Sequence, residues 1–213
     1  QANLTTQGTG VVKFVSPGTT AVSVFNTINH VAGQIDLGDE AMVINYSGAS
    51  PVNALRADLL AGYANGDWNG QGIISAPAAA DVTKSLAIGY VEATDLGSPA
   101  TFLGQTIDST ALLLRSTLYG DANLTRSVDL DDFTALAANF GQAERLWVQG
   151  DYTLDGVINL DDFTALAANF GRILNAADLP ALSAADVPRS AIPEPAGAAI
   201  MAAAVLATMR RQM

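Results

Sequence analysis

Apolar and polar residues follow two different patterns along the chain, which predict two kinds of structure. Up to about residue 118, short β-prone apolar runs are separated by turn residues, with roughly 10 to 16 residues between runs near the N-terminus. This spacing is typical of stacked or solenoid-like strands, or of one end of a β-sandwich. The predicted strands are Val11–Val15, Ala21–Phe25, Ala41–Tyr46, Leu86–Ala93 and Ala111–Leu118.

One short helix is predicted inside this β-rich region, over Val52–Ala61. Ser50 stands at the cap position, Pro51 at the first helical position and Gly62 just past the end. This order of boundary residues is typical of a helix whose ends are set by the local sequence.

Three aromatic or titratable residues of this region offer chemistry, and each has a simpler structural explanation. Tyr63 and Trp68 can stack on a sugar ring, although aromatics in such loops more often fill a small core. The chain has one histidine and no cysteine, so we expect His30 to be a surface or hydrogen-bonded histidine. No nucleophile elbow, phosphate-binding glycine loop or Ser–His pair is present, which favours a non-catalytic region.

The second pattern begins at Gly120, where a short unit occurs twice in the sequence. Gly120–Gly141 and Gly150–Gly171 are identical at 15 of 22 aligned positions, including twelve in a row from Leu130 and Leu160 onwards. Agreement of this extent indicates an internal duplication.

The second half of each unit has the period of a helix. In the first copy five apolar residues fall at i, i+3, i+6, i+7 and i+10, which predicts one buried helix face. Gly141 and Gly171 stand where a left-handed C-terminal cap is expected. The residues of that predicted face are Leu130, Phe133, Leu136, Ala137 and Phe140.

The first half of each unit has the pattern of a 12-residue calcium loop. Such a loop supplies oxygen ligands from positions 1, 3, 5, 7 and 9, a carboxylate at position 12 and a glycine at position 6. The second copy has the turn glycine, Gly156, and acidic residues at three of these positions. Its predicted ligands are Asp151, Thr153, Asp155, the Val157 carbonyl, Asn159 and Asp162.

The first copy departs from this pattern at two positions and is the weaker candidate. Thr125 offers a hydroxyl in place of a carboxylate, and Arg126 occupies the glycine position, where a positive φ costs roughly 1 kcal/mol. The predicted ligands are Asp121, Asn123, Thr125, the Ser127 carbonyl, Asp129 and Asp132. A simpler alternative is that Asp132 and Asp162 only cap helices and favour the helix dipole.

Charge and composition narrow the class of partner. The 213 residues carry a net charge of −11 with a pI of about 4.2, which argues against nucleic acid as a partner. Nine of the 21 acidic residues lie between Asp121 and Asp162, so the negative charge is concentrated at the predicted cation ligands. A low fraction of charged residues (15%) together with abundant Gly, Ala and Thr is typical of an exported bacterial protein.

The duplicated units resemble the type I dockerin family over roughly Leu118 to Ile173. The resemblance rests on the loop aspartates and the sequence Asp-Phe-x-x-Leu-x-x-Asn-Phe-Gly in each helix. It implies two half EF-hands that pack antiparallel, fold on binding calcium and dock onto a cohesin module. The family's partner-choosing positions, often a Ser-Thr-type pair, correspond here to Leu130–Asp131 and Leu160–Asp161.

The C-terminus resembles a PEP-CTERM sorting signal. Pro193, Glu194 and Pro195 precede an apolar run of fourteen residues, Ala196–Met209, and the basic end Arg210–Arg211. The run is shorter than the roughly 17–25 residues of a membrane-spanning helix; a buried core helix is the alternative. The resemblance implies transient membrane insertion and processing by an exosortase during export to the cell surface or extracellular matrix.

The sequence thus predicts an α+β chain with four parts: a β-rich region (1–118), a dockerin-like repeat pair (119–173), a linker (174–191) and a sorting tail with a hydrophobic helix (192–213). The run from Leu37 into the repeats also resembles C-terminal portions of large exported planctomycete-type proteins with β-solenoid repeats. Gln1 follows no signal peptide, so we expect a fragment or processed form of a longer precursor.

We expect a non-catalytic region whose calcium-stabilised module docks a partner or acts as a spacer. The partner classes are an exosortase-type enzyme and a cohesin-like module or surface polysaccharide. Two alternatives remain open. The segment is the attachment tail of an upstream polysaccharide-degrading enzyme, or both loops have lost calcium binding and the repeats are only a helical hairpin.

Overall fold

The computed structural model of the chain describes residues 2–14, 22–175 and 179. Contacts between residues divide the chain into two units, 1–180 and 181–213, and the second unit lies outside the described residues. The described strands and helices therefore all belong to the first unit.

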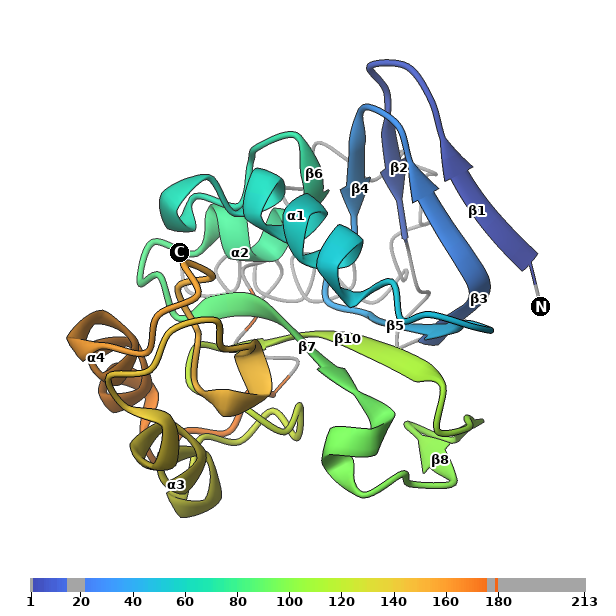
Figure 1. The fold of residues 1–213 in the computed structure, drawn as a ribbon. Coiled ribbons are helices and arrows are strands. Elements are labelled where there is room, and N and C mark those ends of the chain that lie inside the picture. The colour runs from blue at the N-terminus through green and yellow to red at the C-terminus, as the bar shows by residue number, and fades with distance from the viewer. Residues whose placement is uncertain (1, 15–21, 176–178, 180–213) are drawn as a thin grey trace, which may run out of the picture. The chain divides into compact units, whose positions relative to one another are not determined.

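The largest sheet has five strands in the order β1-β3-β5-β10-β7 (Figure 1). Neighbours among the first three strands are parallel, whereas β10 pairs antiparallel with both β5 and β7. All but one of the residues of β7, and likewise of β10, are buried, so these two strands form the centre of the core. The strands are β1 (Ala2–Thr6), β3 (Val22–His30), β5 (Ala41–Asn45), β7 (Leu86–Glu92) and β10 (Ala111–Leu118).

A second sheet is parallel throughout, in the order β2-β4-β6, and β8 and β9 form a small hairpin. From β1 to β5 the chain passes alternately between the two larger sheets. The expected solenoid is nevertheless wrong, because α1 follows β5 and the antiparallel β10 takes the next place in the sheet. These strands are β2 (Val11–Lys13), β4 (Gln34–Asp36), β6 (Gly72–Ile74), β8 (Thr101–Phe102) and β9 (Gln105–Thr106).

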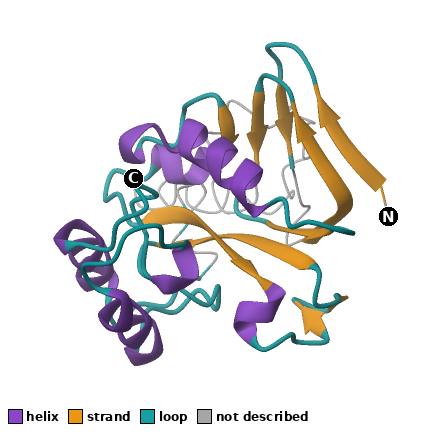
Figure 2. Cartoon of the chain, in the orientation of Figure 1, coloured by secondary structure: helices purple, strands orange, loops and turns teal. Residues whose placement is uncertain are grey.

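Four α-helices and three 3₁₀ turns complete the described residues (Figure 2). The mixed α+β class is confirmed, while the predicted C-terminal hydrophobic helix lies outside the described residues. The helices are α1 (Val52–Tyr63), α2 (Ala76–Ala80), α3 (Leu130–Asn139) and α4 (Leu160–Asn169), and the 3₁₀ turns are η1 (Ala64–Gly66), η2 (Ala93–Leu96) and η3 (Trp147–Gln149).

Helix α1 ends later than its sequence predicts. The Val52 backbone N–H donates to Ser50 Oγ at 3.1 Å, but the helix runs through Gly62 to Tyr63. Gly62 is needed for close packing rather than for a cap, since a Cβ there would lie 1.9 Å from the Ile73 carbonyl oxygen of β6. The predicted end at Ala61, with Gly62 just past it, is therefore wrong.

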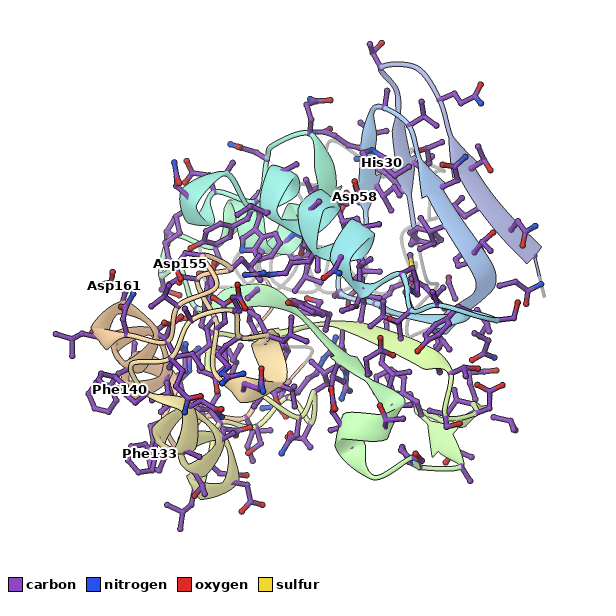
Figure 3. All side chains as sticks on the ribbon, in the orientation of Figure 1. His30, Asp58, Phe133, Phe140, Asp155 and Asp161 are labelled. Carbon is purple, nitrogen blue, oxygen red and sulfur yellow. The ribbon has the colours of Figure 1, made fainter. Side chains whose placement is uncertain are left out.

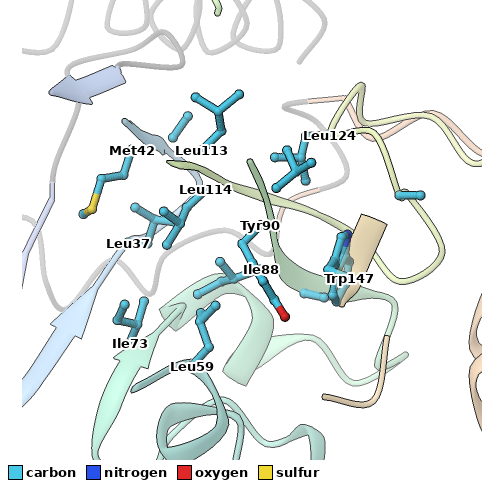
Figure 4. Close-up of a cluster of buried hydrophobic side chains, with 14 of the residues drawn as sticks. Leu37, Met42, Leu59, Ile73, Ile88, Tyr90, Leu113, Leu114, Leu124 and Trp147 are labelled. Carbon is cyan, nitrogen blue, oxygen red and sulfur yellow. The ribbon is translucent and has the colours of Figure 1, made fainter. Parts of the chain in front are cut away.

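One continuous core joins the β-rich region to the duplicated units. Figure 4 shows Trp147 and Leu124 of the repeat segment beside buried side chains of the sheet. Trp68 is fully buried, and its Nε1 donates to the Tyr119 hydroxyl at 2.9 Å. Sugar stacking by Trp68 is therefore excluded, and the core-filling alternative is confirmed for this residue.

Substitution of Trp147 tests how far the two regions depend on each other. Its side chain is fully buried against β7, so Trp147→Ala should lower the free energy of unfolding by about 3–5 kcal/mol. Phe140→Ala, at a side chain that is 52% exposed, is the control and should cost under about 1 kcal/mol. Urea unfolding measures both, and a loss confined to the repeat helices, with the sheet unaffected, would contradict a shared core.

Candidate metal centre

The two units pack against each other by reciprocal backbone contacts. The residues after each helix pair with position 7 of the other unit's loop in short antiparallel bridges, and the hydrogen bonds run to the neighbouring position 8. Gly150 of the second unit packs against Leu136 of the first, and Gly120 against Leu166. The four bonds are Gly141 N to Ile158 O (2.8 Å), Ile158 N to Gln142 O (3.0 Å), Gly171 N to Val128 O (2.8 Å) and Val128 N to Arg172 O (3.0 Å).

The second loop brings its first and last aspartates into the interior. Asp151 and Asp162 are both fully buried. Asp162 Oδ1 accepts from the backbone N–H groups of Tyr152 and Thr153, each at 2.9 Å, and from Thr153 Oγ1 at 3.1 Å. Its Oδ2 accepts from Asn159 N at 3.0 Å, so the closing carboxylate also holds the first turn of α4.

Asp151 has one oxygen that the protein satisfies and one that it does not. Oδ2 accepts from Gly156 N at 3.0 Å and from Arg56 Nη2 at 2.9 Å. Oδ1 is buried and has no hydrogen-bond partner. A buried carboxylate oxygen left without a donor is costly, and a bound cation would satisfy it.

The remaining predicted ligands of the second loop lie nearer the surface. Asp155 is exposed, and its Oδ1 accepts from Val157 N at 2.8 Å. Asn159 caps α4, with Oδ1 accepting from Asp161 N at 2.6 Å. Figure 3 labels Asp155 and Asp161 on this part of the chain. The structure thus brings positions 1, 3 and 12 together, while the side chains at positions 5 and 9 bond to neighbouring backbone.

In the first loop, by contrast, protein donors reach both oxygens of each buried carboxylate. Asp121 Oδ1 accepts from Thr125 N at 3.0 Å, and its Oδ2 accepts from Arg126 N at 2.7 Å and from the Thr117 hydroxyl. Asp132 accepts from Ala122 N at 2.8 Å through Oδ1 and from the Asp129 backbone N–H at 2.9 Å through Oδ2.

The other predicted ligands of the first loop bond to one another. Asn123 Oδ1 accepts from Thr125 N at 3.2 Å, and the Ser127 hydroxyl donates to Asp129 Oδ2 at 3.4 Å. The Ser127 carbonyl accepts from the Thr125 hydroxyl at 3.5 Å. Asp129 also caps α3. This loop leaves no carboxylate oxygen without a donor at its centre.

A calcium ion therefore fits the second loop better than the first. Within the described ranges, no three His, Cys, Asp or Glu side chains lie close enough to hold a metal ion together. Two carboxylates, those of Asp151 and Asp162, lie at the centre of the second loop, and the hydroxyl of Thr153 contacts Asp162. The unsatisfied Asp151 Oδ1 is the feature that favours a cation there.

Burial raises the pKa of the first and last aspartates of each loop. The pKa of Asp151 is raised from 3.8 to about 6, chiefly by loss of solvation, with Asp162 and Asp155 adding repulsion. Asp132 is raised to about 6 for the same main reason, with Asp121 and Asp129 adding repulsion. The pKa values of Asp121 and Asp162 are also raised by burial.

The predicted buried face of the helices is wrong except for one residue per helix. Leu136 is 1% exposed and faces the core beside the buried Asp132, whereas Phe133 and Phe140 are exposed (Figure 3). Ala137 is exposed too, and Leu130 is 65% exposed. The reason is that the loop carboxylate at the helix start must point inward, which turns the phenylalanines outward.

Two exposed phenylalanines, one from each helix, lie next to each other. The rings of Phe133 and Phe163 are 6.5 Å apart in an edge-to-face contact. Leu160 and Phe170 repeat the exposure of their counterparts in the first helix. Leu130–Asp131 and Leu160–Asp161, which the sequence resemblance predicts to choose the partner, are exposed.

Sequence reasoning missed the residues that reach the loops from outside the duplication. Arg56 of α1 contacts Asp151, and Trp147 Nε1 donates to the Asp121 carbonyl at 2.7 Å. Arg115 of β10 donates to the Leu124 carbonyl at 2.6 Å. Arg56 and Asp151 are 95 positions apart, and no local pattern signals such a contact. His30, as expected, is hydrogen-bonded, with Nδ1 2.9 Å from Asp58 Oδ1.

The predicted sorting motif, Pro193–Pro195 with Arg210–Arg211, and almost all of the linker lie outside the described residues. In the part of the chain that the structure describes, no helix has the length and apolar character needed to cross a membrane. Comparison with protein-family models, with curated proteins and with solved structures finds no match to this chain.

The raised pKa values predict how stability depends on pH in a chelator. The folded protein holds protons on Asp132 and Asp151 between about pH 4 and pH 6 that the unfolded chain releases. Stability should therefore fall as pH rises through this window, and the melting temperature with it. The variants Asp132→Asn and Asp151→Asn should each flatten the fall in thermal scans, and an undiminished slope in both would contradict the assignment to these carboxyls.

Proposed function

We propose that residues 119–173 form a non-catalytic, calcium-stabilised dockerin-like module of an exported bacterial protein. One observation carries this proposal: Asp151 Oδ1 is buried at the centre of a calcium-loop pattern and has no partner. The same loop also buries Asp162, which raises the pKa of Asp151 through repulsion. A divalent cation relieves both costs.

The residues that would hold the ion are those of the second loop. Asp151 and Asp162 supply carboxylates, and Thr153 lies within reach of Asp162. Asp155, the Val157 carbonyl and Asn159 complete the pattern of oxygen ligands that calcium prefers. The first loop is the weaker site, since the buried oxygens of Asp121 and Asp132 already accept from protein donors.

Calcium binding would then add to the free energy of unfolding of the module. The closing carboxylate of each loop lies in the first turn of a ten-residue helix, and helices of this length are marginal on their own. Fixing the carboxylate fixes the helix start, so an ion that binds only the folded loop stabilises the whole module.

The cellular role that we propose rests on the sequence motifs. The Pro-Glu-Pro segment, apolar run and basic end favour export to the cell surface or extracellular matrix through an exosortase, with transient insertion of the tail in the inner membrane. The module then acts there as a docking or spacer element.

A second candidate function, attachment of an upstream polysaccharide-degrading enzyme to a cohesin-like partner, is favoured by the exposed apolar helices. Leu130, Phe140 and their counterparts in α4 are each more than half exposed. Calorimetry of the full chain with a purified cohesin module, with and without calcium, tests this candidate. No heat of binding in either condition would leave the spacer role.

Calcium should raise the stability of the wild-type chain, and Asp162→Asn should remove that gain. An ion at about 100 times its dissociation constant adds about 2.7 kcal/mol to the free energy of unfolding. Urea unfolding in calcium chloride and in EGTA measures the gain, and calorimetry gives the number of ions bound.

Asp161→Asn is the matched control. The two aspartates are adjacent, but Asp161 is exposed and Asp162 is fully buried in the loop. The control variant should keep the calcium-dependent gain. Equal stability of the wild-type chain in millimolar calcium and in EGTA would contradict the calcium proposal.

A further inference from the structure

An arginine from outside the duplicated units lies against the second loop. Arg56, on α1, places Nη2 2.9 Å from Asp151 Oδ2 and 3.5 Å from the Leu154 carbonyl oxygen. The Arg56 side chain is 25% exposed and that of Asp151 is fully buried. The contact is therefore a largely desolvated ion pair rather than a surface one.

Gly156 makes this contact possible. A Cβ on Gly156 would lie 2.8 Å from Arg56 Nη2, so a side chain at loop position 6 would displace the guanidinium. Gly156 also has a φ of 85°, which directs its backbone N–H to Asp151 Oδ2. The glycine thus serves the turn and also leaves the space that Arg56 occupies.

The first loop carries its own arginine, and the guanidinium of that arginine lies outside the loop. Its position 6 is Arg126, which keeps a φ of 68° and donates its backbone N–H to Asp121. The Arg126 guanidinium leaves the loop and bonds to the carbonyls of Ser116, at 3.0 Å, and Asp39. Arg115 donates to the carbonyl of Leu124. Leu124 is position 4 of the first loop, and Leu154 is position 4 of the second.

We propose that Arg56 is a tethered cation of the second loop: it partly neutralises Asp151 when calcium is absent and weakens calcium binding when calcium is present. This inference rests on the proposed function, because it concerns the same loop. It goes further by making the calcium affinity a property of the contact between α1 and the repeat.

The physical argument is a competition between two cations for one carboxylate. Arg56 donates to Oδ2 and leaves the unpartnered Oδ1 for an ion. Its charge favours the ion-free loop by pairing with Asp151, and repels a second cation a few ångströms away. Removing the charge should therefore destabilise the ion-free protein and tighten calcium binding.

The experiment compares wild type with Arg56→Gln in the full chain. Calorimetric titration with calcium chloride should give a dissociation constant about tenfold lower for the variant, an order of magnitude typical of one nearby, partly solvated charge. Thermal unfolding in EGTA should show a lower melting temperature for the variant, and saturating calcium should close most of that gap.

Arg145→Gln and Arg56→Lys are the controls. Arg145 also lies in the repeat segment, but its guanidinium bonds to Gln142 Oε1 and not to a loop carboxylate. Removing its charge should leave the calcium affinity within about twofold of wild type. Arg56→Lys keeps the charge and should stay near wild type in affinity; should Arg56→Gln not fold, an affinity for Arg56→Lys as tight as that expected of Arg56→Gln would overturn the inference.

The outcomes separate this inference from the calcium proposal itself. Binding by wild type with an unchanged or weaker affinity in Arg56→Gln overturns the tethered cation and keeps the calcium loop. Binding by Arg56→Gln alone supports the inference in its strongest form. Binding by neither overturns both.

Discussion

The burial of four aspartates in two small loops is the constraint on which the rest of the structure depends. A buried carboxylate without partners is strongly unfavourable, so each loop must direct donors inward. Loop positions 4 and 6 do this by adopting positive φ angles, 61° and 68° in the first loop and 62° and 85° in the second. Asp132 and Asp162 each hold the backbone N–H of their own helix cap, so charge burial and helix initiation are one event.

The same constraint explains why the duplicated units share a core with the β-rich region. Two helices of ten residues, each with one fully buried leucine, bury too little apolar surface to fold by themselves. The missing surface comes from Trp147, which packs onto β7 where Gly89 leaves room for its ring. Its indole also satisfies the Asp121 carbonyl. The loops are therefore assembled against the sheet, and their ligand geometry depends on residues far away in sequence.

Sequence patterns predicted the parts of this arrangement that are local. The duplication, both loop-to-helix boundaries and the strand Ala111–Leu118 agree with the structure, because caps, turn residues and short-range periodicity determine them. The helix face was wrong, since an apolar stripe was assigned to the core although the loop carboxylates already fix which side turns inward. The parallel pairing of β1, β3 and β5, and the approach of Arg56 to Asp151, depend on contacts between distant segments. No single window of sequence contains that information.

The two loops differ at position 6 and in where an arginine side chain lies relative to the leading aspartate. In the first loop this residue is Arg126, whose guanidinium points out of the loop and donates to the carbonyls of Ser116 and Asp39. At the same position the second loop has Gly156, and the guanidinium arrives from α1 instead. A side chain at position 6 of the second loop would require the Arg56 guanidinium to shift, because its Cβ would lie 2.8 Å from Nη2. The residue at position 6 therefore affects whether the Arg56 guanidinium can lie where it does beside the loop. In the first loop both oxygens of the leading aspartate accept from protein donors, whereas in the second Asp151 Oδ1 has none. Position 6 of both loops donates its backbone N–H to Oδ2 of the leading aspartate, and in the second loop Gly156 also leaves the space that the Arg56 guanidinium occupies.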